Sequence, residues 1–577
     1  MASLLALTLL PYLVEAQSLD GLGSLSGSVT GPSEFRAAKV FALNTDKQIQ
    51  YMVYTAGGDY RAINLFPGNY QVRVEKSGFV SDVHNVVVNE GQNATVDVSL
   101  REVSGGMPDA GAAALVPYDT LYPPGPGRIA LEKNCIFCHS ENYLPSRQWT
   151  SEQWQLGVDL LLNVGGPRST LHRSVVPGMP SLVASSTISV HPVGDIEITA
   201  RNTLGASDRE LILGYLTENF GPNSSRRAVQ ELAQPDVPLN EEELAKAMYV
   251  QYLVEPNPEV DVDGAVRQVQ DPHFDRDGYV WFTDRGTHNR LGKLDPRTGE
   301  VVDYMLPDAR DLDPHGMTID EDGYVWWMEE FGNFMGRLDP NTGVMRRWNV
   351  NIDNLILGGL VHDPALDSDQ NVWFSIMQGN HLGKWDRETE NITLYRAPTQ
   401  GQGSYGYGIL VDRRDKVWFV TYHRCELTMF DPVTEEFTAH HALGRATEGG
   451  CVMRRLDEDK DGAIWYGVHS HGKLGKLDPR TGEQEIFDMP VRFGSPYATQ
   501  IDPDGNVWMG DDLTGMVRFN PRTLDFTYFP SPRKSSFPKM EITRDGAIWF
   551  GPRDPGHPRV SVLYPDMNEM TTLGAYY

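Results

Sequence analysis

Residues 315–328 read HGMTIDEDGYVWWM, and this pattern recurs throughout the C-terminal half of the chain. A short apolar run leads into Asp322-Gly323, a dipeptide that favours the positive-φ turn of a tight hairpin. The following residues, Tyr324 to Met328, are aromatic or apolar and typical of a strand. Each copy ends in an apolar residue followed by a tryptophan, at Trp281, Trp326, Trp373, Trp418, Trp465, Trp508 and Trp549.

The spacing of these tryptophans predicts the architecture. Successive steps are 45, 47, 45, 47, 43 and 41 residues, a period that corresponds to one four-stranded blade. Seven copies therefore predict a seven-bladed β-propeller over residues 248–577, in which Met248 to Pro256 forms an outer strand that closes the ring. We interpret the tryptophans as blade-packing residues, because large aromatic side chains dominate buried cores.

Length and charge limit the remaining possibilities. A chain of 577 residues is too long for one ordinary domain, and its net charge of −28 argues against nucleic acid and anionic membranes as partners. The apolar run from Leu4 to Val14 is too short to span a membrane. Together with a candidate cleavage site after Ala16, it makes residues 1–17 a signal-like segment. We expect a periplasmic or otherwise exported protein without a transmembrane span; a cytoplasmic chain with an apolar N-terminus is the alternative.

Residues 18–103 consist of short apolar runs separated by turn residues, which predicts a small β-sandwich. Gly58-Asp59-Tyr60, then the run Leu65 to Tyr70, then Gly78-Phe79 make this segment resemble the carboxypeptidase regulatory-like domain. The resemblance implies a binding or spacer module, and no catalytic constellation is evident there. Residues 104–124, rich in Gly, Ala and Pro, are predicted to be a linker.

The sharpest local motif is Cys135-Ile136-Phe137-Cys138-His139, the C-x-x-C-H sequence of c-type haem attachment. Two thiols one helical turn apart can each form a thioether with a haem vinyl group, and the adjacent histidine then ligates the iron. The alternatives are a zinc half-site and a redox dithiol, but no second cysteine pair follows nearby and a dithiol leaves His139 unexplained. We therefore predict one covalent haem c in a cytochrome c domain over residues 125–222, with a helix from Arg128 to Cys138.

A sixth iron ligand is predicted downstream. Pro177-Gly178-Met179-Pro180 resembles the Met-Pro loop of class I cytochromes c, which makes Met179 the expected ligand; His172 and His191 are the alternatives. A closing helix is expected from Asp208 to Phe220, capped by Ser207. Residues 223–247 are predicted to be a second linker, in which Asn240 caps a short helix.

Propeller geometry places certain loop positions at one mouth of a central channel. The residues eleven positions before the tryptophans, or three to six after them, are rich in His and carboxylates. Convergence from several blades favours a site over an ordinary solvated rim, although a rim residue is the alternative for each. Blade five is expected to depart from the register, with two extra residues near Asp457. The candidate catalytic residues are His315, Glu329, His362 and His469. Cys425 and Cys451, near the same mouth, could form a disulfide or remain two thiols.

The repeat, with Asp-Gly-x-Val-Trp and Leu-Gly-Lys-Leu-Asp-Pro-x-Thr-Gly, resembles the virginiamycin B lyase family over residues 269–577. The resemblance implies a seven-bladed propeller, ring opening by elimination, a Mg²⁺ ion and a histidine base. Asp313-Pro314-His315-Gly316 and Glu329 match the family's motif, so His315 would be the base, with Asp313 and Glu329 near the metal, which could be Mg²⁺ or another divalent ion. The family's other histidine aligns with Gln270 here, and only His273 is close.

Three functions remain open from the sequence. An oxidoreductase would pass electrons from a small or oligomeric substrate at the channel to haem c and then to an acceptor protein. A metal-dependent lyase or hydrolase would carry the cytochrome as an accessory module. A binding protein would dock a partner without turnover.

Overall fold

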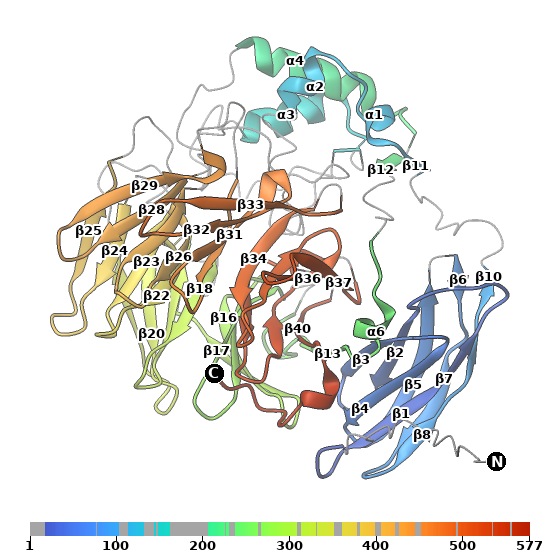
Figure 1. Ribbon diagram of the computed structural model, residues 1–577. Coiled ribbons are helices and arrows are strands. Elements are labelled where there is room, and N and C mark those ends of the chain that lie inside the picture. The colour runs from blue at the N-terminus through green and yellow to red at the C-terminus, as the bar shows by residue number, and fades with distance from the viewer. Residues whose placement is uncertain are drawn as a thin grey trace, which may run out of the picture.

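The computed structural model describes residues 18–76, 78–102, 114–131, 144–145, 148–161, 206–225, 227–229, 237–262, 267–307, 313–330, 332–350, 361–377, 381–398, 406–421, 426–444, 452–491, 494–533, 535–553 and 557–577. Over these ranges the protein is mostly β and divides into a small sandwich, a helical region and a ring of repeated sheets (Figure 1). The predicted sandwich and propeller are both present.

The N-terminal region is a two-layer sandwich. One sheet contains β1 (Gly23–Thr30), β4 (Asp59–Leu65), β8 (Asn93–Thr95) and β9 (Val98–Ser99). The other contains β2 (Lys39–Asn44), β3 (Ile49–Tyr54), β5 (Gly68–Lys76), β6 (Phe79–Val80), β7 (His84–Val88) and β10 (Arg101–Glu102). Alternate residues of β5, including Tyr70, Val72 and Val74, are buried between the sheets, as the period of a half-buried strand requires.

Six four-stranded antiparallel sheets follow, each in simple chain order. Blades one and two are β14 (Val269–Phe274), β15 (Val280–Asp284), β16 (Arg290–Asp295), β17 (Glu300–Met305), then β18 (Pro314–Ile319), β19 (Val325–Glu329), β20 (Phe334–Leu338) and β21 (Met345–Asn349). Blades three and four are β22 (Val361–Leu366), β23 (Val372–Ile376), β24 (His381–Trp385), β25 (Ile392–Arg396), then β26 (Gly406–Val411), β27 (Val417–Thr421), β28 (Glu426–Asp431) and β29 (Glu436–His441). Blades five and six are β30 (Leu456–Glu458), β31 (Ile464–Val468), β32 (Lys473–Leu477), β33 (Gln484–Asp488), then β34 (Pro496–Ile501), β35 (Val507–Asp511), β36 (Gly515–Asn520) and β37 (Asp525–Pro530).

The seventh blade joins the two ends of the ring. It contains β38 (Met540–Ile542), β39 (Ile548–Phe550) and β40 (Arg559–Tyr564), and its outer strand is β13 (Met248–Leu253), which pairs antiparallel with β40. The outer strand predicted at 248–256 is thus confirmed. Contacts between successive innermost strands run around the ring and return from β38 to β14.

The seven tryptophans are buried, and six share one polar contact. In blades one to six the indole Nε1 donates a hydrogen bond to the carboxylate six residues earlier, as Trp326 does to Asp320 at 2.8 Å and Trp508 to Asp502 at 2.8 Å. A buried donor without a partner costs free energy, so this aspartate lets each indole lie fully in the core. In blade seven the equivalent residue is Thr543.

The sandwich and the propeller share a sheet. Strand β13 pairs with β40 on one edge and with β3 on the other, so blade seven and the second sandwich sheet form one continuous ten-stranded sheet (Figure 1). Their cores also merge, because Tyr51 of the sandwich and Trp549 of blade seven belong to one apolar cluster. Pairing along β13 removes two sheet edges at once and fixes the N-terminal domain against the ring.

The helical region lies beside one face of the ring (Figure 1). Its described helices are α1 (Tyr118–Leu121), α2 (Pro126–Leu131), α3 (Ser151–Leu161) and α4 (Ala206–Asn219), accompanied by the parallel pair β11 (Ala114–Val116) and β12 (Arg227–Val229). Helix α4 corresponds to the predicted closing helix, but it begins at Ala206 and includes Ser207. The short helix α6 (Glu241–Leu244) is capped by Asn240, as predicted. The remaining elements are the 3₁₀ turns η3 (Ala442–Gly444), η4 (His469–His471) and η5 (Met567–Glu569).

None of the described helices has the length and apolar character that a membrane crossing requires.

Candidate functional site

An irregularity in the innermost strands builds the site. Strands β14, β18, β22, β26 and β34 each carry one extra residue relative to their partner, as between Pro314 and Met317 in β18. Such bulges re-aim side chains and are frequent next to active sites. In β18, β22, β26 and β34 they lie eleven and ten residues before the tryptophan of the blade, and in β14 they lie ten and nine residues before it. Polar groups at these two positions therefore meet at the axis of the ring.

We call the convergent residues the mouth cluster. Position eleven before the tryptophans supplies Gln270, His315, His362, Tyr407, Arg454 and Tyr497; position ten supplies Asp271, Asp363, Arg455 and Lys539; neighbouring loops supply Arg285, Asp313, Glu330 and Arg553. Every blade thus contributes at least one member.

Position ten alternates between long charged residues and small ones around the ring. Blades one, three, five and seven carry the charged residues, whereas blades two, four and six carry Gly316, Gly408 and Ala498. A Cβ at Gly316 would overlap the carbonyl oxygen of His362, and one at Gly408 would overlap that of Arg454. The small residues therefore leave the room in which the charged side chains of the other blades meet.

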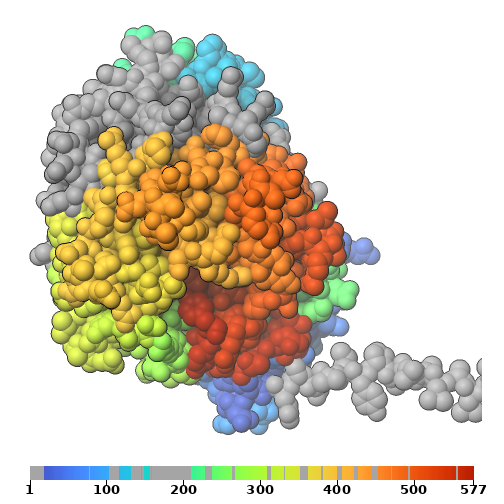
Figure 2. All heavy atoms as spheres, turned by 60° about the vertical axis from the view of Figure 1, so that its left-hand side comes forward, coloured from blue at the N-terminus to red at the C-terminus, as the bar shows by residue number. Residues whose placement is uncertain are grey.

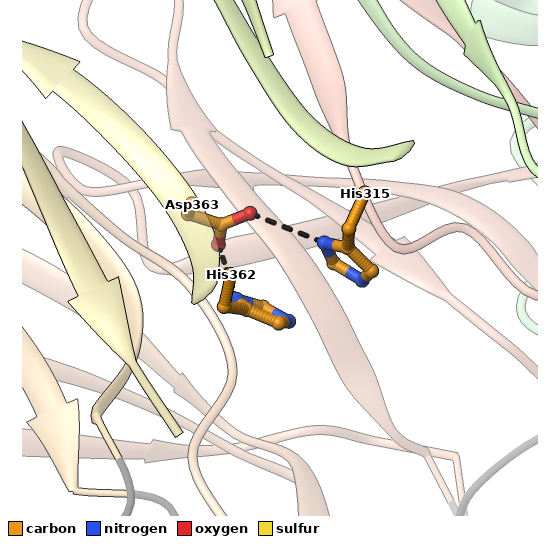
Figure 3. A group of neighbouring side chains, drawn as sticks. All are labelled: His315, His362 and Asp363. Carbon is orange, nitrogen blue, oxygen red and sulfur yellow. Dashed lines mark ion pairs between the residues drawn. The ribbon is translucent and has the colours of Figure 1, made fainter. Parts of the chain in front are cut away.

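The centre of the cluster is a pair of stacked imidazoles beside a carboxylate. The ring centroids of His315 and His362 lie 3.9 Å apart, and Asp363 points toward both rings (Figure 3). Its carboxylate is 3.0 Å from His362 Nδ1 and 3.5 Å from His315 Nδ1. Burial lowers the pKa of His362 to about 4 and, with the neighbouring His362 and Arg285, lowers that of His315 well below its usual value. Both imidazoles are therefore neutral at pH 7.

Asp363 is also held by two cations. Its carboxylate pairs with Arg455 from blade five and lies 2.6 Å from Lys539 Nζ from blade seven. The same lysine pairs with Asp271 from blade one. Burial raises the pKa of Asp363, but Arg455, His362 and Lys539 together hold it well below its usual value. This buried chain of alternating charges crosses the axis and ties blades one, three, five and seven together.

Aromatic rings and guanidiniums complete the other side of the cluster. The Tyr407 ring stacks on His362 with centroids 4.0 Å apart, and its hydroxyl lies 2.5 Å from that of Tyr497. The Arg454 guanidinium lies 4.5 Å from the Tyr497 ring centroid, and that of Arg455 lies 4.8 Å from the Tyr407 centroid. Burial alone would raise the pKa of Tyr497, but the nearby guanidiniums lower it.

The rim contains a second ionic group, built around Arg285. Its guanidinium pairs with Asp313 and lies 3.0 Å from Glu330, and Nη1 donates to Gln270 at 3.0 Å. Gln270 also accepts from Arg553 Nε at 3.0 Å and contacts His315 Nε2 at 3.3 Å. Burial and the adjacent Asp313 raise the pKa of Glu330 to about 8, so this side chain is largely protonated at neutral pH.

The sequence-predicted residues fall into three groups. His315 and His362 lie together at the centre, and the buried His469 lies beside Tyr497 with ring centroids 5.4 Å apart. Glu329 is buried, but its carboxylate accepts from Trp327 Nε1 at 3.0 Å and pairs with Arg347. Cys135, Cys138, His139 and Met179, together with Cys425 and Cys451, lie outside the described residues.

Blade five corrects one expectation. Leu456, nine residues before Trp465, pairs with Tyr466, the residue after it. In blade two, Met317 and Trp327 have the same positions relative to Trp326 and also pair. Blade five therefore has no extra residues near Asp457. The residues eleven and ten positions before Trp465 are therefore Arg454 and Arg455. The expected two-residue insertion would have assigned other residues to these positions.

The arrangement fits Mg²⁺ poorly. Magnesium prefers several oxygen ligands, yet Asp313 is paired with Arg285 and Glu329 with Arg347. Among the described residues, the one group of three or more side chains with metal-ligand spacing is His315, His362 and Asp363. Two imidazoles and a carboxylate suit a transition metal by donor type, but Asp363 is already neutralised by Arg455 and Lys539. What the cluster offers chemically is neutral imidazole bases beside buried guanidiniums.

Comparisons with known proteins agree with the two predicted β domains. Residues 259–437 match the model of the virginiamycin B lyase family, and residues 24–101 match that of the carboxypeptidase regulatory-like domain. The first match covers blades one to three and most of blade four. No curated protein matches this chain.

Several solved structures are similar to part of this chain. A streptogramin B lyase is 17% identical, with 55% of this chain and 97% of that chain covered and a TM-score of 0.47. Virginiamycin B lyase from Staphylococcus aureus is 20% identical, with 51% and 94% covered and a TM-score of 0.45. The extracellular domain of a putative one component system from B. thetaiotaomicron is 15% identical, with 51% and 38% covered and a TM-score of 0.41.

Proposed function

We propose that this chain is an exported oxidoreductase that passes electrons from a substrate bound at the mouth cluster to a haem c held in residues 125–222. In this proposal Cys135 and Cys138 attach the haem, His139 and Met179 ligate its iron, and an acceptor protein receives the electrons. The single observation that carries the proposal is the position of the helices that flank the attachment motif.

Those helices pack on the face of the ring where the mouth cluster lies. One apolar cluster contains Leu131 of α2, Trp154 of α3 and Leu216 of α4 together with Val491 and Leu513 of blades five and six. Val491 precedes the innermost strand β34, and Leu513 follows the second strand β35, so both belong to loops on the mouth face. Helix α2 ends at Leu131, four residues before Cys135.

The described helical core is chemically suited to a porphyrin. Tyr122 stacks edge-on against Phe220 with centroids 5.3 Å apart, and Tyr118, Leu121 and Trp154 are buried with them. An apolar, largely dry surrounding is one of the means by which proteins set the reduction potential of haem. When bound, haem c supplies a one-electron acceptor, so a two-electron oxidation would need two transfers to the acceptor protein.

The mouth cluster would bind the substrate and take up its proton. His315 and His362 are neutral at pH 7, as a general base must be, and neither is locked as a cation by Asp363. The rings of Tyr407 and Tyr497 provide a flat apolar wall for a small molecule. Loss of two electrons from an alcohol or phenol releases protons, for which these imidazoles are the nearest neutral acceptors in the cluster.

The test begins with the haem itself. We expect the exported full-length chain to stain for haem and to exceed the polypeptide mass by one porphyrin, and the variant carrying Cys135→Ala and Cys138→Ala to lose both properties. The control variant carries Cys425→Ala and Cys451→Ala, which leaves the attachment motif intact. Anaerobic addition of a panel of alcohols, sugars and phenols should then reduce the haem band. A colourless exported protein, or a haem that no panel member reduces, contradicts the proposal.

A second candidate is an elimination reaction of the type named by the matching family. The match to residues 259–437 and the neutral, buried His315 favour it. The poor fit of Mg²⁺ weighs against the metal-assisted form. Turnover of a cyclic depsipeptide that survives loss of haem and falls at least a hundredfold in His315→Gln would support this candidate, whereas absence of turnover in wild type would remove it.

A further inference from the structure

The mouth cluster is electropositive although the chain as a whole is strongly acidic. Five cations meet there: Arg285, Arg454, Arg455, Lys539 and Arg553. They face the carboxylates of Asp271, Asp313, Asp363 and Glu330, of which Glu330 is largely protonated at neutral pH. In a chain of net charge −28, an excess of positive charge at a buried site points to an anionic ligand.

Several buried polar atoms of the mouth cluster make no hydrogen bond to the protein. Within the ranges that the structure describes, Arg455 Nη2 and His362 Nε2 make no hydrogen bond, although Arg455 is 9% exposed and His362 is fully buried. The other Arg455 nitrogens donate to Asp363 and to the Pro538 carbonyl. A guanidinium donor without an acceptor is costly at such a depth, so Arg455 Nη2 is suited to an acceptor supplied by a ligand.

The surrounding aromatic rings define the shape of that ligand. His362 and Tyr407 stack with centroids 4.0 Å apart, and Tyr497 lies beside Tyr407. Arg454, Arg455 and Arg553 lie 4.5–5.9 Å from the centroids of these tyrosines. The faces of such rings favour contact with a planar group, and a carboxylate matches the fork of a guanidinium. The helical segments, cyan and green at the top of Figure 2, pack on the mouth side of the ring.

We propose that the mouth cluster binds the carboxylate of a planar aromatic acid, with Arg455, Arg454 and Arg553 as its cationic partners. The inference rests on the proposed function, since it names the substrate class of that site. A cationic ligand is disfavoured by the same guanidiniums. A neutral aromatic ligand would stack on the tyrosines but leave the excess positive charge of the cluster without a counter-charge.

Isosteric ligands test the charge requirement on the wild-type protein. The probes are 4-hydroxybenzoate, the neutral 4-hydroxybenzamide and the cationic 4-hydroxybenzylamine, titrated calorimetrically into the full chain. We expect the carboxylate to bind at least tenfold more tightly than the amide, and the amine not to bind. Equal affinity for acid and amide, or no binding of the acid, overturns the inference.

Matched variants locate the site. Arg553→Met should weaken 4-hydroxybenzoate binding about tenfold, whereas Arg553→Lys keeps the charge and should stay within about threefold of wild type. Arg346→Gln, which alters an exposed arginine paired with Glu390, should leave the affinity unchanged. An affinity that is insensitive to Arg553→Met, in a variant whose melting temperature equals that of wild type, places the ligand elsewhere and contradicts the inference.

Failure here is distinguishable from failure of the proposed function. If the carboxylate binds and no substrate reduces the haem, the anion site stands and the redox proposal fails. If neutral alcohols reduce the haem while the carboxylate does not bind, the redox proposal stands and the anion site fails.

Discussion

The two ends of the described channel lining use the same strands but opposite chemistry. At the mouth, positions ten and eleven before the tryptophans carry guanidiniums, imidazoles and Lys539, which outnumber the carboxylates of Asp271 and Asp363. Two or three residues further along the innermost strands, position eight carries His273, Asp457 and Glu541, where His273 Nδ1 lies 3.3 Å from Glu541. Burial raises the pKa of Asp457 to about 7 and also raises that of Glu541. A single bulge thus separates a cation-rich mouth from two carboxyl groups whose pKa values burial raises.

This difference shows what the blades leave free to vary. The Trp–Asp hydrogen bond and the hairpin turns fix each blade, and they are the same in blades one to six. The residue types at the bulged positions differ from blade to blade, so they can follow a ligand more freely than the repeated core can. Function in such a fold is expected at these positions rather than in the repeated core.

The largest effect is expected from the cation that bridges two carboxylates. Lys539→Met leaves Asp271 and Asp363 buried with one cationic partner fewer, and should lower the free energy of unfolding by about 3–5 kcal/mol. The matched change at the acidic end, Glu541→Gln, should cost less than about 1 kcal/mol, because burial disfavours the charged form of that carboxyl and an amide keeps its size. Urea denaturation followed by tryptophan fluorescence compares the two. Equal losses would remove the distinction between the ends.

The next effect concerns the small residues at position ten. Gly316→Ala places a methyl group against the His362 carbonyl and should lower stability by about 1–3 kcal/mol, because the core there has no room to relax. Gly323→Ala is the control for volume, since a Cβ there meets no atom within 4 Å; its positive φ makes a smaller loss expected from backbone strain alone. A loss at Gly316 no greater than at Gly323 would contradict the packing account.

A pH-dependent effect is expected at the acidic end. Folding raises the pKa of Asp457 to about 7, above its unfolded value, so its contribution to stability is lost as pH rises from about 4 to about 7. Asp457→Asn should therefore be more stable than wild type at pH 8, by about 1–2 kcal/mol, and equal to it at pH 4. Thermal melts at both pH values measure this. The opposite pH dependence would show that Asp457 is stabilised as the anion.

The smallest effect is the pH dependence of anion binding at the mouth. Glu330, which faces Arg285, Asp313 and Arg553, ionises near pH 8 and then adds negative charge to the cluster. The affinity for 4-hydroxybenzoate should fall about threefold between pH 7 and pH 9, and Glu330→Gln should remove most of that fall. A wild-type affinity that rises with pH would contradict the charge balance of the mouth.

The sequence predicts the repeated parts of this protein well and its exceptions less well. The tryptophan period is enough to count blades and to place His315 and His362 on one ring, because register in a sheet is set by regular alternation. It does not predict that Glu329 would turn to Arg347 or that Asp313 would pair with Arg285, since both contacts depend on side chains distant in the sequence. The sequence predicts that β13 closes the ring by pairing with blade seven, because its apolar pattern identifies a strand. The pattern does not predict the second pairing, with β3 of the sandwich.

Blade five shows why a regular count is more reliable than local spacing. Because an insertion was expected near Asp457, Arg454 and Arg455 were not recognised as mouth residues. The residue pairs of β30 and β31 keep the register of the other blades. These two arginines give the mouth its positive charge. For the haem motif, local spacing alone is informative, since its five residues predict a cofactor without reference to the repeat or the fold.

The most direct test of the account is anaerobic reduction of the haem band by an aromatic acid. With the full-length exported protein, oxidisable phenolic carboxylates should reduce the haem, and the Arg553→Met variant, although fully loaded with haem, should need about tenfold more of the same acid. Reduction that is equal in both proteins, or a fully loaded haem that stays oxidised with every acid and alcohol tested, would contradict the transfer of electrons from the mouth cluster.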